Sequence, residues 1–463
     1  MPQRRSVVIV GGGFAGTSTA RALVRRLPAD TDLTLVSEES YTTFSPMLPE
    51  AVGASIFPEQ VVAPLRELLQ PNRRSRFVMG RVTAIDIAAR RLRCETLAGE
   101  RELAYDHLVL AFGNRARLDM IPGMAEHALP LKTVGDALEI RNVVLRRLAR
   151  IELETDAALR RALGHFVVIG GGFSGVEVAG ELVDCLASIR HFYPQVAPDE
   201  LKVTVLHQGE RLLPELPVSL GISALNSLRR RGVQVCLGVS AMRVLEHGAE
   251  LSDGTLLASH TVLGTIGTRP NALVEAMGLP TERGRIVVAA DLSVRGHPGV
   301  WALGDCAAVP NAFDGKNAPA TAQFAVREGC LLATNLPLAL QGHATHVFRH
   351  RPLGSMASIG HMKGVATLFG CPLTGLPAWL LWRAYYLSQM PTIGRKLRIF
   401  VEWTWGMFFP TDITHLRFPG SQALLRTEQE DRERAVPLPL CSAVERVPRR
   451  MSLPKQPGRS LDS

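Results

Sequence analysis

Several features that define other classes of protein are scarce or missing in this sequence. Its seven cysteines are scattered over 463 residues and form no C-x-x-C pair, which excludes a disulfide framework and a metal site of the usual zinc spacing. No apolar run is long enough to cross a bilayer, so we expect no transmembrane helix. The first apolar strand begins within a few residues of Met1, and we therefore expect no signal or transit peptide.

The net charge of +9 is concentrated near the C-terminus. Residues 345–418 contain eight Lys and Arg against two acidic residues, together with four of the five tryptophans. Basic residues mixed with interfacial aromatics are typical of a membrane surface rather than of a nucleic-acid site. We therefore expect a peripheral membrane contact and no nucleic-acid partner.

Two glycine-rich motifs of the same form lie 159 positions apart. Each follows an apolar run rich in β-branched residues and opens a helix of small residues. The glycines are Gly11, Gly13 and Gly16 in the first motif, and Gly170, Gly172 and Gly175 in the second. In this spacing the first glycine permits a tight turn, the second lets backbone approach a pyrophosphate, and the third lets the helix pack on the strand. The helix N-terminus then presents free N–H groups to the phosphates. The duplication predicts two dinucleotide sites, an arrangement suited to moving a hydride from one to the other.

The order of the apolar runs predicts an α/β protein in which one Rossmann-like domain is inserted in another. Runs at 7–10, 33–36 and 107–116 predict strands of the first domain, and runs at 166–169 and 203–206 predict strands of the second. The run VWALGDCAA, which begins at Val300, then returns the chain to the first domain. We expect a first domain in two parts at 1–131 and 291–344, joined by a helical connection at 132–163 to an inserted domain at 164–290. A membrane-associating region at 345–418 and a disordered tail at 419–463 follow.

Two carboxylates follow strands of the first domain where they can bind a nucleotide. Glu38 lies 22 positions after Gly16, where a carboxylate accepts hydrogen bonds from both ribose hydroxyls of an adenine dinucleotide. Asp305, after Gly304, can hold a ribitol hydroxyl, which would make the first site an FAD site. The structural alternatives are a solvated acid for Glu38 and a helix cap for Asp305. Gly113, in the turn that ends the run at 107–116, is a further candidate contact.

The second site departs from the usual pattern for NADH. His207 and Gln208 follow its second strand, where a carboxylate normally binds the adenine ribose. Without that carboxylate a 2′-phosphate is not repelled, and Arg211 is close enough in sequence to attract one. The nicotinamide substrate is therefore either NADH or NADPH, and the alternative for His207 is an ordinary loop residue. Gly267, in the turn that closes this domain, is a further candidate for nucleotide contact.

Glu177 is a candidate catalytic residue because it lies two positions after Gly175, near the place where nicotinamide would meet flavin. A carboxylate there can relay a proton, and Glu181 lies one helical turn further on the same face. The structural alternative is a favourable acid in the first turn of a helix. Residues 41–60, where disulfide reductases carry a redox cysteine pair, contain no cysteine. Electrons must therefore leave the flavin directly to an external acceptor.

Over residues 6–418 the sequence resembles the type II NADH:quinone oxidoreductases, single-chain flavoproteins with two dinucleotide-binding domains. YTTFSPMLPEAVGA (41–54) and the C-terminal stretch 354–409 carry the resemblance, as does APATAQFAVREG (318–329), which is similar to the family's AQ-x-A-x-Q quinone motif. The resemblance implies non-covalent FAD at the first site, NAD(P)H at the second, and a quinone that approaches the far face of the flavin. We expect no proton pumping, because no segment of the sequence is expected to span a bilayer.

The resemblance also assigns roles to particular residues. Ala322 and Gln323 match the quinone motif, whereas the family's second glutamine is Arg327 here. It places Glu177 near flavin and quinone, which favours the catalytic reading. It places Val82 where backbone commonly meets the adenine of the flavin.

Two amphipathic helices are expected to form the membrane contact. The first begins at Pro377, and the second begins at Arg395 and has Leu397 and Phe400 on one side. The aromatic residues that share one face of the first helix are Trp379, Trp382 and Tyr386. Packing on the protein's own core or in a homodimer seam is the alternative. With the reducing environment that the cysteines suggest, we expect peripheral attachment through 377–409 to the cytoplasmic face of a membrane.

Two other functions fit the same pattern. A sulfide:quinone oxidoreductase needs two cysteines across the flavin, and the candidates are Cys185, Cys330 and Cys371. A flavin-binding redox sensor that signals through its tail and membrane contact is a non-enzymatic alternative, suggested by His207 and Arg327.

Overall fold

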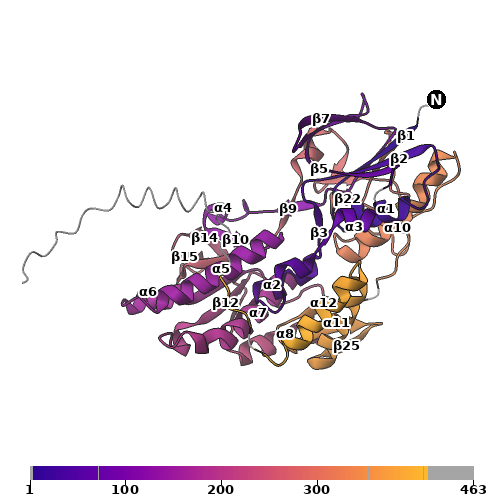
Figure 1. Ribbon diagram of the computed structural model, residues 1–463. Coiled ribbons are helices and arrows are strands. Elements are labelled where there is room, and N and C mark those ends of the chain that lie inside the picture. Colours follow the sequence, from indigo (N-terminus) through magenta and orange to yellow (C-terminus); the bar gives the residue numbers. More distant parts are fainter. Residues whose placement is uncertain (1–3, 71, 353, 410, 416–463) are drawn as a thin grey trace, which may run out of the picture. The chain divides into compact units, whose positions relative to one another are not determined.

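The first sheet is built from segments that lie far apart in the sequence (Figure 1). The computed structural model describes residues 4–70, 72–352, 354–409 and 411–415, so the predicted tail at 419–463 lies outside the described residues. In spatial order the strands are β21 (Val300–Ala302), β8 (His107–Leu110), β1 (Arg5–Val10), β2 (Thr31–Ser37), β5 (Ser75–Asp86), β6 (Arg91–Thr96) and β7 (Gly99–Ala104). β1 pairs in parallel with β2 and β8, and β8 pairs in parallel with β21. The strand at 300–302 therefore returns the chain to the first sheet, as predicted.

A second parallel sheet is formed by the chain between β8 and β21. In spatial order its strands are β10 (Ala128–Pro130), β17 (Thr261–Gly264), β11 (His165–Ile169), β12 (Lys202–His207) and β13 (Gln234–Leu237). All neighbouring strands in it are parallel. Parallel sheets are buried on both faces, which explains why every residue of β11 is buried and why all but its first, His165, are apolar. The expected fold class, with one Rossmann-like unit inserted in the other, is confirmed.

Helices and small antiparallel sheets complete the described residues. The helices are α1 (Phe14–Leu23), α2 (Leu48–Val52), α3 (Leu65–Leu69), α4 (Met124–His127), α5 (Val134–Ile151), α6 (Ala157–Leu163), α7 (Phe173–Ile189), α8 (Val218–Arg230), α9 (Ala272–Ala276) and α10 (Ala322–Leu340), with 3₁₀ turns such as η2 (Pro58–Val61) and η5 (Gly304–Cys306). The small sheets pair β3 (Tyr41–Thr43) with β4 (Val62–Pro64), β9 (Asn114–Ala116) with β18 (Thr268–Pro270), β14 (Ala241–Leu245) with β15 (Gly248–Leu251) and β16 (Leu256–Ala258), and β19 (Thr281–Glu282) with β20 (Arg285–Val287) and β22 (Ala307–Ala308).

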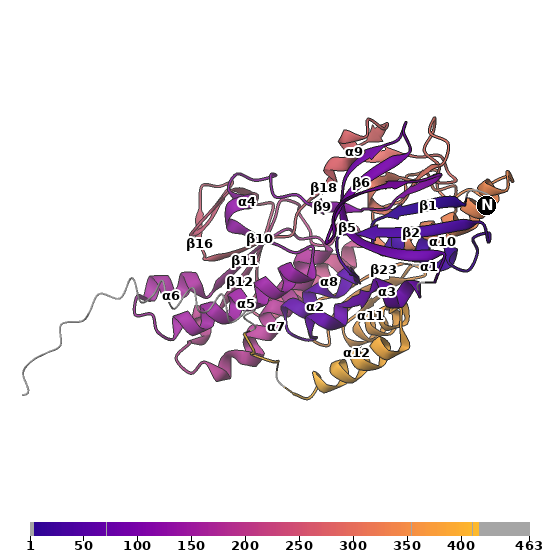
Figure 2. The ribbon, with the colours of Figure 1, turned by 45° about the horizontal axis from the view of Figure 1, so that its top comes forward.

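The C-terminal part of the described chain adds a three-stranded antiparallel sheet and two helices. These are β23 (Gly354–Ser358), β24 (Gly364–Leu368), β25 (Cys371–Thr374), α11 (Leu376–Gln389) and α12 (Ile393–Trp405). Figure 2 shows α11 and α12 lying beside each other, in agreement with their contacts. None of the described helices is long and apolar enough to span a bilayer.

The predicted aromatic face of α11 is packed inside the protein. Trp379 and Trp382 are each 1% exposed, and Trp403 of α12 is 4% exposed. The guanidinium of Arg383 stacks between two of these rings, 3.6 Å from the Trp379 centroid and 4.7 Å from the Trp403 centroid. The expectation that this face of α11 meets a membrane is therefore wrong, because its aromatic side chains form part of the core.

A different set of apolar side chains is exposed in the same region. We call this set the apolar face, and it comprises Phe369 between β24 and β25, Leu376 and Leu380 of α11, and Ile393, Leu397, Phe400, Val401, Trp405 and Phe408 in and after α12. Phe369 and Ile393 are 82% and 84% exposed. A cluster of large exposed apolar side chains is unusual on a monomeric soluble protein and marks a surface for interaction.

Candidate functional site

The first glycine motif forms an open cradle. A Cβ on Gly16 would lie 1.9 Å from the carbonyl oxygen of Gly11, and Gly11 itself has a φ of +112°, so both positions require glycine. Gly13 differs, because a Cβ there would meet nothing within 4 Å. The backbone at Gly13, the N-cap of α1, thus faces free space in which a phosphate can approach the helix N-terminus.

A cavity of about 410 Å³ lies in front of this cradle. Of the residues expected at the first site, its lining contains Gly11, Gly13, Glu38, Val82, Gly113, Gly304, Asp305 and Ala322, but not Gly16. They come from the turn between β1 and α1, the segments after β2 and β8, β5 itself, the turn η5 after β21, and α10. The parallel strands of the sheet end at this edge, which is where open α/β sheets bind ligands. The glycine cradle and this lining therefore fit the adenine and pyrophosphate part of FAD.

The two carboxylates of this cavity have different surroundings. Glu38 is partly exposed, and its Oε2 accepts a hydrogen bond of 2.7 Å from Nη2 of Arg115. Asp305 lies within the 3₁₀ turn η5. The alternative that Asp305 caps a helix beginning at Cys306 is wrong, because the turn ends at that residue. Burial lowers the pKa of the nearby Lys132, and the charge of Asp305 opposes this shift.

Glu328 supports the turn before Asp305, which the sequence alone did not indicate. Its Oε2 accepts a hydrogen bond of 2.7 Å from the backbone N–H of Gly304. Burial raises the pKa of Glu328 to about 7, although the Gly304 N–H and the charge of Arg285 lower it. Glu328 follows Arg327 on α10, and its distance in sequence from β21 left no local signal for this contact.

The second glycine motif forms a cradle with the same geometry. Gly170 has a φ of +123°, and a Cβ on Gly175 would lie 1.9 Å from its carbonyl oxygen, whereas a Cβ on Gly172 would meet nothing within 4 Å. His207 packs on this loop, with its Nδ1 accepting a hydrogen bond of 3.2 Å from the N–H of Gly171. The imidazole thus lies against the glycine loop at the end of β12, the position at which the sequence predicts the adenine ribose.

Two other residues near the second cradle are fixed by their own loops. The guanidinium of Arg211 donates hydrogen bonds to the carbonyl oxygens of Leu216 and Pro214, at 2.9 and 2.6 Å. Arg211 is therefore turned into its own loop, which weakens the expectation that it attracts a 2′-phosphate. Gly267 has a φ of +71° and lies between β17 and β18, beside the side chain of Met120.

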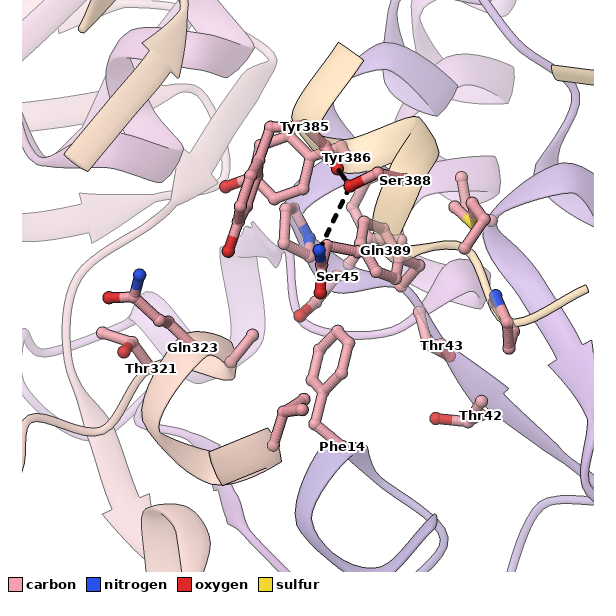
Figure 3. A pocket seen from close by; sticks show the side chains of 18 of the residues that line it. Phe14, Thr42, Thr43, Ser45, Thr321, Gln323, Tyr385, Tyr386, Ser388 and Gln389 are labelled. Atoms are coloured by element: carbon pink, nitrogen blue, oxygen red, sulfur yellow. Dashed lines mark hydrogen bonds between the residues drawn. The ribbon is translucent and has the colours of Figure 1, made fainter. Parts of the chain in front are cut away.

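A larger cavity, of about 810 Å³, adjoins the first one (Figure 3). The two cavities share the lining residues Phe14, Thr43, Ser45, Lys132 and Ala322. Figure 3 shows Phe14 of α1, Gln323 of α10 and Tyr386 of α11 around the larger one. The shared lining means that a long cofactor such as FAD can lie with its adenine end in one cavity and its ring system in the other.

The structure brings the two expected catalytic residues, Glu177 and Gln323, into the lining of this larger cavity. Glu177 is 8% exposed, and the backbone N–H of Ser358 donates a hydrogen bond of 3.2 Å to its Oε1. Burial raises the pKa of Glu177 well above its usual range, against the Ser358 hydrogen bond, and Glu50 and Glu181 add to the rise. This environment favours a protonated carboxyl beside the cavity, which is the form that a proton donor needs.

Basic residues line the same cavity. Arg327 donates a hydrogen bond of 3.2 Å to the carbonyl oxygen of Gln323 on its own helix, and Arg21 of α1 and Lys396 of α12 also line the cavity. Among the described residues that line either cavity there is no cysteine. These linings therefore offer no cysteine pair through which electrons could pass to or from a flavin. Nor do the described residues contain a cluster of metal-binding side chains.

Two dinucleotide cradles, with a large cavity adjoining the first and lined by the buried carboxyl of Glu177, are the features of a flavin-dependent pyridine nucleotide oxidoreductase. Residues 5–329 match the model of the pyridine nucleotide-disulphide oxidoreductase family, and residues 353–412 match the model of the NDH2 C-terminal domain. The chain belongs to the first of these families and, within it, to the type II NADH:quinone oxidoreductases.

Two relatives and one solved structure illustrate this membership. The type II NADH:quinone oxidoreductase NdhA of Mycobacterium tuberculosis is 31% identical over 429 residues, which cover 88% of this chain and 87% of the relative. Ndh of the same organism is 29% identical over 442 residues, 93% of each chain. The structure of NDH2 from Plasmodium falciparum in complex with NADH has the same fold, with a TM-score of 0.83, 18% identity, and coverage of 89% of this chain and 100% of that chain.

Proposed function

We propose that this chain carries out the reaction of its family, the FAD-dependent oxidation of NADH or NADPH by a quinone. The observation that carries the proposal is the pair of adjoining cavities, one at the first glycine cradle and the other lined by Glu177 and Gln323. Bound FAD supplies the chemistry, since it accepts a hydride from nicotinamide and passes two electrons to a quinone. The domain boundaries expected at 131, 163, 290 and 344 are part of the same proposal.

The first cradle would hold FAD through several kinds of contact. Backbone at Gly13 and the N-terminus of α1 would bind the pyrophosphate. Glu38 would accept hydrogen bonds from the adenine ribose, and Asp305 from the ribitol. Val82 would contact the adenine, while Gly113 and Gly304 allow backbone to approach the cofactor closely, since both have positive φ.

The second cradle would hold the nicotinamide substrate, and His207 determines which nucleotide it accepts. Backbone at Gly172 and the N-terminus of α7 would bind its pyrophosphate. With no carboxylate at the end of β12, NADPH is not repelled there. Gly267 would pass close to the nucleotide on the opposite side of the loop.

Two residues of the larger cavity would act on the quinone. Glu177 would donate a proton to a quinone oxygen, because its surroundings favour the protonated form. Gln323, at the N-terminus of α10, would donate a hydrogen bond from its amide to the other oxygen. The aromatic side chains of Phe14 and Tyr386 would exclude water around the reacting rings.

Oxidation of the two nucleotides by the purified protein, followed at 340 nm, tests this function. We expect rapid oxidation that requires a water-soluble quinone, with NADPH accepted as well as NADH. A His207→Glu variant should raise the KM for NADPH about tenfold or more, since a carboxylate beside a phosphate is repelled, while the KM for NADH stays the same or falls. Failure of both nucleotides to reduce the bound flavin contradicts the proposed function, whereas an unchanged KM for NADPH contradicts only the role of His207.

We further propose that the apolar face binds the cytoplasmic surface of a membrane. The region around it carries eight Lys and Arg against two acidic residues, a charge that suits anionic headgroups. The larger cavity is lined by Phe369 of this face and by Lys396 on α12, so a lipid-soluble quinone could enter from the bilayer. A shallow contact of this kind makes the protein monotopic.

A double substitution on the apolar face tests this membrane contact. Leu397→Glu with Phe400→Glu should lower binding to anionic liposomes about 10- to 100-fold, because two apolar side chains no longer insert. Oxidation of NADH with a water-soluble quinone should be retained. Leu256→Glu, at an exposed leucine of β16, is the matched control. Unchanged liposome binding, together with conversion of a dimer to a monomer, would instead assign this face to the homodimer expected as the alternative.

A further inference from the structure

Three carboxyl groups are buried together beside the larger cavity, and the proposed function uses only one of them. Glu50 of α2, Glu177 of α7 and Glu181 of α7 are 2%, 8% and 4% exposed. α2 packs against α7, which brings the three side chains into one region of the core. Glu177 lines the larger cavity, whereas Glu50 and Glu181 lie behind it. Buried carboxyls are costly to a fold, and the two inner ones therefore call for an explanation.

Each inner carboxyl has defined hydrogen-bond partners. Oε2 of Glu50 accepts a hydrogen bond of 3.0 Å from the indole N–H of Trp403, and its Oε1 lies 3.9 Å from Nη2 of Arg383. Oε2 of Glu181 accepts a hydrogen bond of 2.7 Å from the hydroxyl of Ser55. The partners come from α11, α12 and the segment after α2, so the cluster is held from several sides.

Both inner carboxyls take up and release protons more easily near neutral pH than ordinary carboxyls do. Burial raises the pKa of Glu50 to about 7, although the charge of Arg383 and the N–H of Trp403 lower it. Burial, and then the charge of Glu50, raise the pKa of Glu181 to about 8. Because both pKa values are raised, the carboxyls are protonated below these values and become ionised as the pH rises through them.

The other titratable groups around the cluster leave its charge to be balanced by Arg383. They are Asp184 and Cys185 on α7, Tyr386 on α11, Glu402 on α12, Arg141 on α5 and His361 between β23 and β24. Asp184 is paired with Arg231 at 2.7 Å, and burial raises the pKa values of Cys185 and Tyr386, which keeps both neutral. If one carboxylate balances Arg383, two of the three carboxyls carry a proton.

Unpartnered polar atoms around the carboxyls indicate that the region holds water. Within the described residues the hydroxyl of Ser358 and Nε of Arg383 are buried without a hydrogen-bond partner. Ser358 adjoins Glu177, and Arg383 adjoins Glu50. Buried polar atoms of this kind are usually satisfied by ordered water molecules, which can also carry protons between carboxyls.

We propose that Glu50, Glu181 and Arg383 form a proton store that reloads Glu177 during quinone reduction. The inference rests on the proposed function and extends it to residues outside the cavity. Oxidation of NADH by a quinone consumes one proton, because NADH supplies two electrons and one of the two hydrogens of the hydroquinone. The O–H bond of Glu177 breaks as its proton moves to a quinone oxygen, and the resulting carboxylate is reprotonated through water by Glu50 or Glu181. The one proton that each turnover takes up is therefore replaced on Glu177 from the proton held by Glu50 or Glu181.

The store is refilled from solvent by way of Glu402. This residue is half-buried on α12, and its Oε1 accepts a hydrogen bond of 2.7 Å from the N–H of Phe57. Its charge acts on Glu50, and burial raises its own pKa. Buried N–H groups of Arg141 without partners among the described residues lie near Glu402 and mark further space for water.

A comparison of two electron acceptors tests the proton store. Ferricyanide takes electrons without protons, whereas a water-soluble quinone needs both. A Glu50→Gln/Glu181→Gln variant keeps the size and hydrogen bonds of the neutral carboxyls but holds no transferable proton. Its quinone turnover should fall about tenfold or more and lose its inflection between pH 6 and 9. Ferricyanide turnover, flavin reduction by NADH and thermal stability should stay within about twofold, as in the surface control Glu139→Gln.

Two results would overturn the proton store. Quinone turnover and pH profile that match the unmodified protein would show that the inner carboxyls take no part. An equal loss with both acceptors would show that they only support the fold. Each single variant gives the same comparison if the double variant folds poorly. A protein that bleaches its flavin with NADH yet never reduces a quinone would contradict the proposed function itself, which these variants do not test.

Discussion

A Gly172→Val variant should raise the KM for NADH about 100-fold or more while FAD stays bound. Gly172 has a φ of −79° and a ψ of −168°, which valine adopts without strain, and a Cβ there meets nothing within 4 Å. The substitution therefore leaves the fold intact but fills the space in which backbone would approach the pyrophosphate. FAD content from the absorbance at 450 nm, flavin reduction by NADH and thermal unfolding provide the measurements.

The first cradle offers the matched substitution. Gly13→Val should cost the protein its FAD, because Gly13 faces equally free space at the N-cap of α1. The isolated protein should then be colourless but still folded, and should still bind NADH. An unchanged KM for NADH in Gly172→Val, or full FAD content in Gly13→Val, would show that the phosphates lie elsewhere.

A Glu177→Gln variant should lower kcat with a quinone about 100-fold, with little change in flavin reduction by NADH. In the proposed function this carboxyl donates a proton at the cavity, and glutamine cannot give up a proton. Since burial raises the pKa of Glu177, the carboxyl stays protonated until the pH passes that raised value. Turnover of the unmodified protein should therefore decline as the pH rises through it, and the variant should lose this decline.

The raised pKa of Glu177 also makes stability depend on pH. The sign of this dependence is opposite to that of an ion-paired carboxylate, whose pKa is lowered in the folded protein. In the unfolded chain the carboxyl ionises near the ordinary glutamate pKa of 4.5, whereas in the folded protein it keeps its proton to a higher pH. The free energy of unfolding therefore falls as the pH rises between these two values. Glu177→Gln should remove this part of the pH dependence, measured by denaturant unfolding. A variant with full quinone turnover would exclude Glu177 as the donor.

Local spacing predicted the parts of the site that depend on one strand and the turn after it. The glycines of each motif, and the position of Glu38 and Asp305 after their strands, follow from the mechanics of a strand-to-helix turn. The insertion of one sheet in the other followed from the second glycine motif and from the apolar run at 300–308. These signals lie within a few residues of what they predict.

Contacts between distant segments could not be predicted in this way. Glu50 and Trp403 are 353 positions apart, and neither has a neighbour in sequence that indicates the other. The prediction for the aromatic face of α11 is wrong because an apolar face has the same sequence pattern whether it packs on a core or on a lipid surface. Arg211 was placed near the nucleotide by its sequence position, yet its guanidinium binds the carbonyl groups of its own loop.

The first sheet is completed by a strand, β21, that comes after the whole second sheet in the sequence. This order determines which parts can fold first during synthesis on the ribosome. The strands of the second sheet lie between Ala128 and Gly264, so that unit can fold before β21, the edge strand of the first sheet, has been made. α12, which lines the larger cavity through Lys396 and reaches Glu50 through Trp403, emerges later still. In a nascent chain the second cradle can thus form before α12 is available to close the larger cavity.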